Sequence, residues 1–432
     1  MELTLPKGTR DFMPEEKIAR DNIVSLLKET FKLYGYNPLE TPAIENYETL
    51  ASKYAGGSEI LKEIYKLTDN AERKLGLRYD LTVPLARFIS MNPMVKKPFK
   101  RYQIDRVWRD GPIKLGRYRE FWQCDADIIG SKSMLADAEL IAMASDFFRK
   151  LDMKVSISVN NRKLMNAMLE SANVPRENQD DVILSIDKLS KIGISGVKKE
   201  LEEKGIGYDI IDSIISVIST KGTSNLDVLD KLGRVVKTND SINELRELLG
   251  YCSEFGLSSI MLDISLARGL SYYTGTVFEI FLEDKAVLSC SLAGGGRYDN
   301  MIGSFIGSKE SMPAVGISFG LDTISDAARL LNKSVSRKSV VDAYIIPINT
   351  IRECIAMLKS LRKKNICSDM DFSGRSITKN LDYADKLGIK FVLILGEDEL
   401  KKNKVNIKDM KTGDEKLVKF EDAVKLIKKN HL

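Results

Sequence analysis

The chain is 432 residues long, with 43% hydrophobic and 29% charged residues, which is enough apolar sequence for two or three domains with buried cores. Its formal net charge is +5, and residues 341–432 contain 19 basic and 14 acidic residues, so the whole excess falls there. The single histidine is His431, which excludes Ser-His-Asp triads, histidine general bases and histidine zinc sites from the body of the chain. Chemistry must therefore use carboxylates, arginines, backbone groups or a bound metal ion.

The five cysteines are scattered and form no C-x-x-C pair, which favours a reducing compartment over a disulfide framework or a zinc site. The N-terminus has no basic-then-apolar signal pattern, and no apolar run is long enough to span a membrane. We therefore expect a cytoplasmic protein with no membrane partner. The basic C-terminal part is compatible with a polyanionic partner and equally with a lysine-rich solvated surface.

The first expected element is a helix over residues 15–34, where apolar residues recur at helical spacing, followed by an extended run. Residues 77–84 then alternate, so that Arg78, Asp80 and Thr82 are expected on one face of a strand. A strand face of this composition is usually just solvated, so the pattern alone does not indicate a site.

Residues 99–129 predict two antiparallel strands, 102–109 and 117–129, joined by a loop. In the second strand, the period of two places cationic, aromatic and then acidic side chains in order along one face. These residues are Arg117, Arg119, Phe121, Gln123, Asp125 and Asp127. Such a face suits a ligand with phosphates, a planar base and an ammonium group, and we prefer this interpretation to a solvated face.

The next segments predict a helix over 131–151 and a strand over 154–159. From about residue 166 to residue 250, charged and leucine-rich helical periods alternate with Gly and Asn/Asp breaks. This texture indicates an inserted helical subdomain.

The stretch Arg268–Glu279 places a guanidinium beside two tyrosines, between strands expected over 260–266 and 276–282. Taken alone, it favours a hairpin whose tyrosines belong to the core. A second stretch, Gly294–Asp299, follows as a glycine turn that presents a further Arg-Tyr pair.

Together, the segments ARGLSYYTGTVFE and AGGGRYD resemble the two signature motifs of the histidyl-tRNA synthetase family. Residues 99–129 and 313–324 resemble motifs 2 and 3 of class II aminoacyl-tRNA synthetases, and the segment RYDLT resembles the histidine site of archaeal and eukaryotic members. The helix and extended run near the start resemble motif 1, which forms the dimer interface in that family. The resemblance therefore implies a homodimer.

The resemblance implies an α+β catalytic domain with an antiparallel sheet over residues 1–330, interrupted by a helical insertion over 166–250. In the family, an insertion at this place approaches the acceptor stem of tRNA. Residues 331–340 are polar and are expected to form a linker. Strand-helix alternation over residues 341–432 predicts a small α/β domain with a parallel core, which resembles the anticodon-binding domain of the family.

The resemblance also assigns roles at the site. The catalytic residues are Arg268 and Arg109, on either side of the α-phosphate of ATP, and Mg2+ accompanies the outer phosphates. ATP is bound by Arg109, Arg117 and Phe121, of which Phe121 stacks on adenine. Histidine is bound by Asp80, Thr82, Gln123, Asp127, Tyr273 and Tyr298. Asp80 matches the carboxylate that holds the α-ammonium, the two tyrosines match imidazole contacts, and no residue is assigned as a metal ligand.

The implied activity is ATP-dependent formation of histidyl-adenylate and transfer of histidine to the 3'-terminal adenosine of tRNA(His). Three positions depart from the family pattern: Gly111 replaces a motif 2 glutamate, with Asp110 one place early, Thr323 replaces a motif 3 arginine, and Ser271 replaces a common aspartate. One alternative is a histidine-sensing regulatory subunit of ATP phosphoribosyltransferase, which Thr323 favours and the C-terminal domain disfavours. Another is a tRNA-binding scaffold that forms no adenylate.

Overall fold

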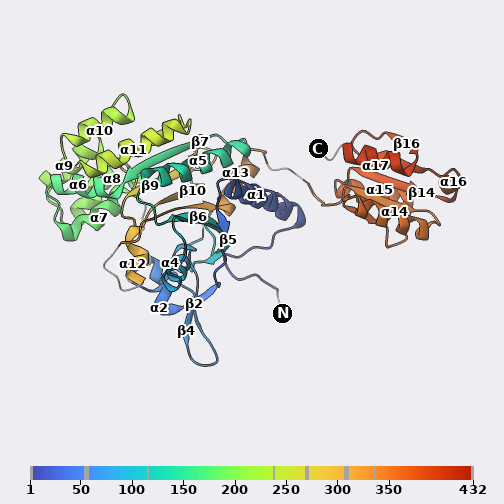
Figure 1. The fold of residues 1–432 in the computed structure, drawn as a ribbon, viewed down its shortest axis with the longest axis horizontal. Coiled ribbons are helices and arrows are strands. Elements are labelled where there is room, and N and C mark those ends of the chain that lie inside the picture. Colours follow the sequence, from blue (N-terminus) through green and yellow to red (C-terminus); the bar gives the residue numbers. More distant parts are fainter. Residues whose placement is uncertain are drawn as a thin grey trace. The chain divides into compact units, whose positions relative to one another are not determined.

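A computed structural model describes residues 3–52, 58–113, 116–236, 239–267, 272–305, 311–333 and 337–429 (Figure 1). The chain divides into two compact units, one made chiefly of residues 23–333 and one chiefly of residues 337–429. Each unit has its own sheet and its own buried apolar clusters. None of the described helices combines the length and apolar character needed to cross a membrane.

The large unit is organised around an eight-stranded sheet with the order β1-β5-β6-β11-β10-β9-β7-β8. Its edge pairs β1·β5 and β7·β8 are parallel, and the pairs between them are antiparallel. The strands are β1 (Asn37–Pro38), β5 (Phe99–Trp108), β6 (Glu120–Ile129), β7 (Val155–Asn161), β8 (Ile260–Leu262), β9 (Thr276–Leu282), β10 (Ala293–Arg297) and β11 (Ala314–Gly320). The predicted antiparallel catalytic sheet is thus confirmed.

Three helices cover one face of this sheet and form the main core: α1 (Pro14–Leu33), α5 (Met134–Lys150) and α13 (Leu321–Leu330). Phe319 of β11 lies at its centre, with ring centroids 5.8 Å from Phe31 and 5.4 Å from Phe147. Truncating such a buried phenylalanine to alanine typically costs about 3–5 kcal/mol, so the apolar face of β11 fixes the sheet against the helices.

The opposite face carries a smaller layer. The helices are α2 (Tyr47–Leu50), α3 (Ser58–Lys62), α4 (Thr82–Met91) and α12 (Asp299–Phe305). A second sheet has the order β2-β4-β3, with β2 (Ile44–Asn46), β3 (Lys66–Thr68) and β4 (Lys74–Leu77). An apolar cluster joins α4 to α12 and to the ends of β6 and β11, so this layer is anchored at one end of the large sheet.

Among the residues that the structure describes, six helices lie between β7 and β8: α6 (Arg162–Ser171), α7 (Arg176–Ile186), α8 (Leu189–Glu203), α9 (Tyr208–Ile218), α10 (Asn225–Gly233) and α11 (Asp240–Glu254). They form the green to yellow-green group in Figure 1. In α9, Ile211, Ile214 and Ile218 recur at spacings of three and four and are buried. A helical module was predicted here, while its proposed boundaries at 166 and 250 stay predictions.

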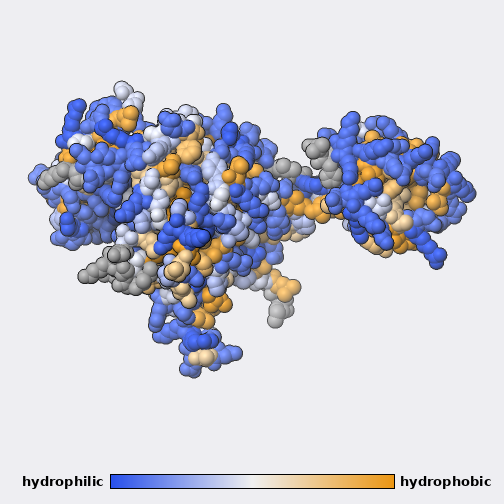
Figure 2. Space-filling model, in the orientation of Figure 1, coloured by the Kyte–Doolittle hydropathy of each residue, from blue (hydrophilic) through white to orange (hydrophobic). Residues whose placement is uncertain are grey.

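The small unit contains a five-stranded sheet with the order β13-β12-β14-β15-β16. Its strands are β12 (Ala343–Pro347), β13 (Ser368–Met370), β14 (Phe391–Leu395), β15 (Val405–Asp409) and β16 (Glu415–Val418), and its helices are α14 (Ile351–Lys363), α15 (Ile377–Lys386), α16 (Glu397–Lys401) and α17 (Phe420–Lys429). The first three strands are parallel, which confirms the predicted parallel core. Separate apolar clusters lie on the two faces of the sheet, and the visible outer surface is mostly polar (Figure 2).

The predicted strand over residues 77–84 is wrong. Strand β4 ends at Leu77 and helix α4 begins at Thr82. The carboxylate of Asp80 accepts a hydrogen bond from the Val83 backbone N–H (3.0 Å), as an acidic residue does at a helix start, and Pro84 fits the first turn. Asp80 and Thr82 therefore lie at the start of a helix and not along one face of a strand.

The predicted glycine turn over residues 294–299 is also wrong, because Ala293–Arg297 forms a central strand of the large sheet. A Cβ on Gly295 would lie 2.0 Å from the Gly316 carbonyl oxygen, and one on Gly296 would lie 2.5 Å from the Thr276 carbonyl oxygen. The glycines thus permit close packing against the neighbouring strands. The strand predicted over 260–266 is likewise shorter and ends at Leu262.

Candidate active site

Strand register gathers polar side chains on the sheet face opposite the main core. Asp127 of β6 lies between Arg101 of β5 and Gly316 of β11. Asp125, two residues earlier, lies between Gln103 and Ser318 in the same way. Since alternate residues share a face, these side chains form one polar surface with Gln123.

The best-defined part of this surface is a group of side chains around Asp127, joined by one hydrogen bond and one ion pair. The Tyr298 hydroxyl donates to Asp127 Oδ1 (2.6 Å), and Arg101 Nη2 lies 2.8 Å from Asp127 Oδ2. All three side chains are buried, and Arg101 is 0% exposed. A Cβ on Gly316 would lie 1.9 Å from Asp127 Oδ1, so the glycine provides the space that the carboxylate occupies.

Two further buried carboxyl groups lie near this group. Burial raises the pKa of Asp80 to about 6 and that of Asp125 to about 7, and the nearby Arg101 opposes both shifts. The negative charges of Asp127 and Asp80 add to the rise at Asp125. Three buried carboxyls outnumber the two arginines beside them, Arg101 and Arg109, so the site favours a cationic ligand.

Two buried acceptor atoms on this surface lack a donor among the described residues. Asp125 Oδ1 and Gln123 Oε1 are buried and have no hydrogen-bond partner among the described residues. Buried acceptors are normally satisfied, so a donor group of a ligand is the natural partner for each. The amide Nε2 of Gln123 donates to Ser318 Oγ (3.1 Å), which fixes the orientation of the side chain.

The two predicted imidazole-contacting tyrosines form a wall beside these acceptors. The Tyr273 ring packs directly on Gly296, where a Cβ would lie 2.8 Å from ring atoms. Its centroid is 4.8 Å from that of Tyr272, which in turn lies 6.2 Å from Tyr298 in an edge-to-face arrangement. Tyr273 and Tyr298 are therefore brought to the same region.

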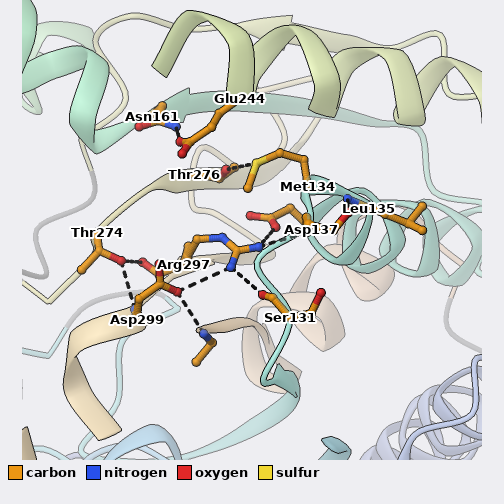
Figure 3. Close-up of polar contacts among 12 residues, drawn as sticks. Ser131, Met134, Leu135, Asp137, Asn161, Glu244, Thr274, Thr276, Arg297 and Asp299 are labelled. Atoms are coloured by element: carbon orange, nitrogen blue, oxygen red, sulfur yellow. Dashed lines mark hydrogen bonds and ion pairs between the residues drawn. The ribbon is translucent and has the colours of Figure 1, made fainter. Parts of the chain in front are cut away.

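Arg297 does not face this region, although the sequence pattern suggested that it is presented together with Tyr298. Its guanidinium points to the other face of the sheet, where it donates to the carbonyl oxygens of Ser131 (2.8 Å) and Ser133 (3.2 Å) and pairs with buried Asp137 (Figure 3). Its own carbonyl oxygen accepts from Thr274 N–H (2.8 Å). Arg297 thus fixes the segments that carry Tyr273 and Tyr298, from the opposite face of the sheet.

The predicted nucleotide-binding residues lie at the other end of β6. Arg109 Nε donates to the Tyr79 carbonyl oxygen (3.0 Å), and its guanidinium is 5.2 Å from the Phe121 ring centroid. Arg109 also opposes the raised pKa of Asp80, so it lies between the acidic group and Phe121. Arg117 is 46% exposed and pairs with Glu63 at 3.1 Å.

The predictions for Arg268 and Ser271 concern residues that lie outside the described part of the chain.

Thr323 is the third residue of α13, and its hydroxyl donates to the Gly320 carbonyl oxygen (2.8 Å). A Cβ on Gly116 would lie 3.2 Å from Thr323 Cγ2. Thr323 therefore borders the connection between β5 and β6, where the family places an arginine.

Two residues of the site were not assigned a role from the sequence. Asp125 could have been found, because the period of two puts it on the same face as Gln123 and Asp127. Arg101 could not, since its place opposite Asp127 depends on the register between β5 and β6.

The antiparallel sheet, its polar face and the separate small α/β unit together define a class II aminoacyl-tRNA synthetase fold. A family profile described as histidyl-tRNA synthetase matches residues 8–324, and one described as an anticodon binding domain matches residues 342–430. The chain belongs to the histidyl-tRNA synthetase family.

Individual relatives agree with this assignment. Histidine–tRNA ligase 1 of Bacillus cereus is 46% identical, over 96% of this chain and 97% of the relative. The crystal structure of histidyl-tRNA synthetase from Nostoc sp. PCC 7120 has a TM-score of 0.86 at 32% identity and covers 100% of both chains. A Bacillus halodurans structure described as an ATP phosphoribosyltransferase regulatory subunit/histidyl-tRNA synthetase has a TM-score of 0.74 at 22% identity, over 88% of this chain and 96% of that chain, and shows the fold alone.

Proposed function

We propose that the protein is an enzyme, a histidine–tRNA ligase, which activates histidine with ATP and transfers it to the 3'-terminal adenosine of tRNA(His). The observation that carries this proposal is the buried acidic group of Asp80, Asp125 and Asp127, next to Tyr298 and Tyr273. It offers carboxylates to an ammonium group and polar partners to an imidazole ring. Membership of the family supplies the reaction.

In the proposed first step, a histidine carboxylate oxygen attacks the α-phosphorus of ATP, the bond to the β-phosphate oxygen breaks, and pyrophosphate leaves. Arg109 and Arg268 bracket the α-phosphate and offset its developing charge, while Arg117 holds the outer phosphates and Phe121 stacks on adenine. A terminal ribose hydroxyl of tRNA then attacks the acyl carbon and AMP leaves. The protein acts mainly by positioning and charge neutralisation, which fits a chain body without histidine.

Selection of histidine is proposed to depend on pairing both ends of the amino acid. Asp80, Thr82 and Gln123 hold the α-ammonium, and Asp127, Tyr298 and Tyr273 contact the imidazole ring. An amino acid without these ring nitrogens leaves buried polar groups unpaired, which can give roughly 10⁴-fold discrimination.

The wider context is proposed from the same family. Among the described residues, no cluster of three or more acidic, histidine or cysteine side chains is arranged to hold a metal ion, so Mg2+ is proposed to enter on the oxygens of the triphosphate. We propose a cytoplasmic homodimer. Its catalytic domain spans residues 1–330 with a helical insertion at 166–250, and a linker at 331–340 leads to an anticodon-binding domain at 341–432.

The test is histidine-dependent exchange of pyrophosphate into ATP, followed by charging of tRNA(His). We expect robust exchange by the wild-type chain and its loss in Arg268→Ala and Arg109→Ala. Arg106→Ala, which removes an exposed arginine from the same strand region as Arg109, is the matched control and is expected to retain exchange. A folded chain that binds histidine without exchange would contradict the proposal and favour the regulatory-subunit alternative.

A further inference from the structure

We propose that Glu63 supplies the carboxylate that position 111 lacks, and that it selects adenine by accepting a hydrogen bond from the exocyclic amino group of the base. This inference rests on the proposed function, because it takes ATP as the substrate. It assigns a substrate contact to a residue outside all the sequence motifs.

The Glu63 carboxylate fills the space beside the Gly111 backbone. A Cβ built on Gly111 would lie 2.6 Å from Glu63 Oε1 and 3.1 Å from Glu63 Oε2. The Glu63 carboxylate therefore occupies the place where a side chain of residue 111 would begin. A residue distant in the sequence brings a carboxylate to the position where the motif 2 pattern has one.

In addition, Glu63 is held on both sides of the connection between β5 and β6. Its carbonyl oxygen accepts from Asp110 N–H (2.8 Å), and its own N–H donates to the Ile60 carbonyl oxygen (2.9 Å) at the end of α3. Its carboxylate pairs with Arg117 at 3.1 Å, on the returning side. With 18% of its side chain exposed, Glu63 is fixed in place and remains accessible to a ligand.

Asp110, the carboxylate nearest to position 111 in the sequence, is less suited to this role. Its side chain is 47% exposed and pairs with Arg119 Nη1 at 2.9 Å. Arg119 Nε also donates to the Gly111 carbonyl oxygen (3.3 Å), so this pair braces the main chain. The Asp110 carboxylate is thus engaged with Arg119, whereas the Glu63 carboxylate pairs with Arg117.

The chemistry of a carboxylate accounts for the choice of base. An ionised carboxylate only accepts hydrogen bonds, and adenine presents an amino donor where guanine presents a carbonyl acceptor. Phe121 lies on β6 and Arg109 directly follows β5, and the two are proposed to hold the base and the α-phosphate. A carboxylate at the edge of this region favours ATP and disfavours GTP.

The geometry permits a reciprocal exchange of the carboxylate between the two positions. Gly111 has no left-handed backbone conformation, so it can accept a side chain once Glu63 is shortened. The variants are Glu63→Ala, Gly111→Glu and the double variant Glu63→Ala/Gly111→Glu. Asp110→Ala is the matched control, since it removes the neighbouring carboxylate.

Two readouts are measured for each variant: KM for ATP and for histidine in pyrophosphate exchange, and equilibrium binding of ATP against GTP, which requires no turnover. We expect Glu63→Ala to raise KM for ATP by about tenfold and to lower the ATP-over-GTP binding preference by about tenfold, as loss of one charge-assisted hydrogen bond does. KM for histidine is expected to stay within about twofold of the wild-type value, because Glu63 is not among the residues proposed to bind histidine. Gly111→Glu alone is expected to be as damaging as Glu63→Ala. The double variant is expected to recover most of the ATP-over-GTP binding preference.

An unchanged nucleotide preference in Glu63→Ala, or a double variant no better than Glu63→Ala, would overturn the proposal. So would an equal effect in Asp110→Ala. If the wild-type chain binds ATP without exchange, the proposed function fails and the binding preference still decides the role of Glu63. If it binds no nucleotide, both proposals fail.

Discussion

The proposed histidine end and the proposed nucleotide end of the site are built in different ways. At the histidine end, Asp127, Tyr298 and Arg101 are buried, and Asp127 already accepts a hydrogen bond from Tyr298 and pairs with Arg101 before any ligand arrives. At the nucleotide end, Arg117 is 46% exposed and pairs with Glu63 across the connection between two strands. The histidine end is fixed by buried contacts on the sheet. The nucleotide end is fixed by the partly exposed pair of Arg117 and Glu63, which we call the rim of the site.

This difference teaches how selectivity and turnover can be divided within one site. A rigid, desolvated pocket discriminates well because a wrong ligand leaves buried groups unpaired. A solvated pair of charges at the rim costs little to separate, so phosphates can replace the carboxylate partner of an arginine and leave again. We therefore expect substitutions at the histidine end to affect both stability and histidine binding, and substitutions at the nucleotide end to affect ATP binding alone.

The largest expected effect is that of Arg101→Met. Removing one member of a buried ion pair leaves uncompensated charge and typically costs about 3–5 kcal/mol, here in a region with three buried carboxyls. Urea unfolding of the large unit should show this loss. Arg106→Met, on the same strand and 49% exposed, should cost less than about 1 kcal/mol. Equal losses in the two variants would remove the contrast between the buried and exposed ends.

Gly316→Ala should come next. The new Cβ would lie 1.9 Å from Asp127 Oδ1, so the carboxylate must move and its bond to Tyr298 is lost. Overpacking of this kind costs about 1–3 kcal/mol, and we expect KM for histidine to rise about 10- to 100-fold with KM for ATP nearly unchanged. Gly233→Ala is the control, since a Cβ there meets nothing within 4 Å. A larger rise in KM for ATP would contradict the assignment of Asp127 to the histidine end.

The pH dependence should separate the two ends as well. Asp80 and Asp125 have pKa values of about 6 and about 7, raised by burial from an ordinary value of 3.8. They must be ionised to hold an ammonium group, so KM for histidine should rise as the pH falls from about 8 to about 6. Below their raised pKa values the folded chain binds protons that the unfolded chain has lost, so these groups make the ligand-free fold less stable as the pH rises from about 4 to about 7.

Asp125→Asn is the variant that tests this origin, because it removes the group with the higher pKa. Its KM for histidine should depend less steeply on pH, and its thermal stability should fall less between about pH 4 and about pH 7. If the variant kept the full pH dependence in both measurements, the titration would belong to other groups.

The smallest effect on stability is expected at the rim. Arg117→Ala removes an exposed arginine and should change the free energy of unfolding by less than about 1 kcal/mol. Its KM for ATP should nevertheless rise about tenfold, as expected for one lost phosphate contact. Arg329 is also an exposed arginine paired with a carboxylate, that of Asp326, and Arg329→Ala should change neither quantity. A marked loss of stability in Arg117→Ala would show that the rim is as tightly built as the histidine end.

Much of the fold could be predicted from local patterns. The helix over residues 15–34 and the strand over 276–282 are present as α1 and β9, because apolar periodicity decides both. The alternating face of Gln123, Asp125 and Asp127 is also present, since a half-buried strand enforces a period of two.

The errors came where longer-range packing overrides local signals. Three consecutive glycines in β10 suggested a turn, whereas Gly295 and Gly296 permit the close approach of two neighbouring strands, which the sequence does not display. Alternation at residues 77–84 suggested a strand, whereas the Asp80 side chain accepts a hydrogen bond from the Val83 N–H in the first turn of helix α4. Glu63 lies outside every motif, and only the folded connection between β5 and β6 reveals what it can touch. The roles of Arg268 and Ser271 remain predictions.

The helical region also constrains how this family can change over evolution. β7 and β8 run parallel and adjacent, with Ile157 opposite Ile260, so the helices between them form the crossover that a parallel pair requires. A tight turn cannot replace such a connection, while a longer or shorter helical one can. We therefore expect this region to tolerate remodelling as a module, provided that at least one helix still carries the chain back across the sheet.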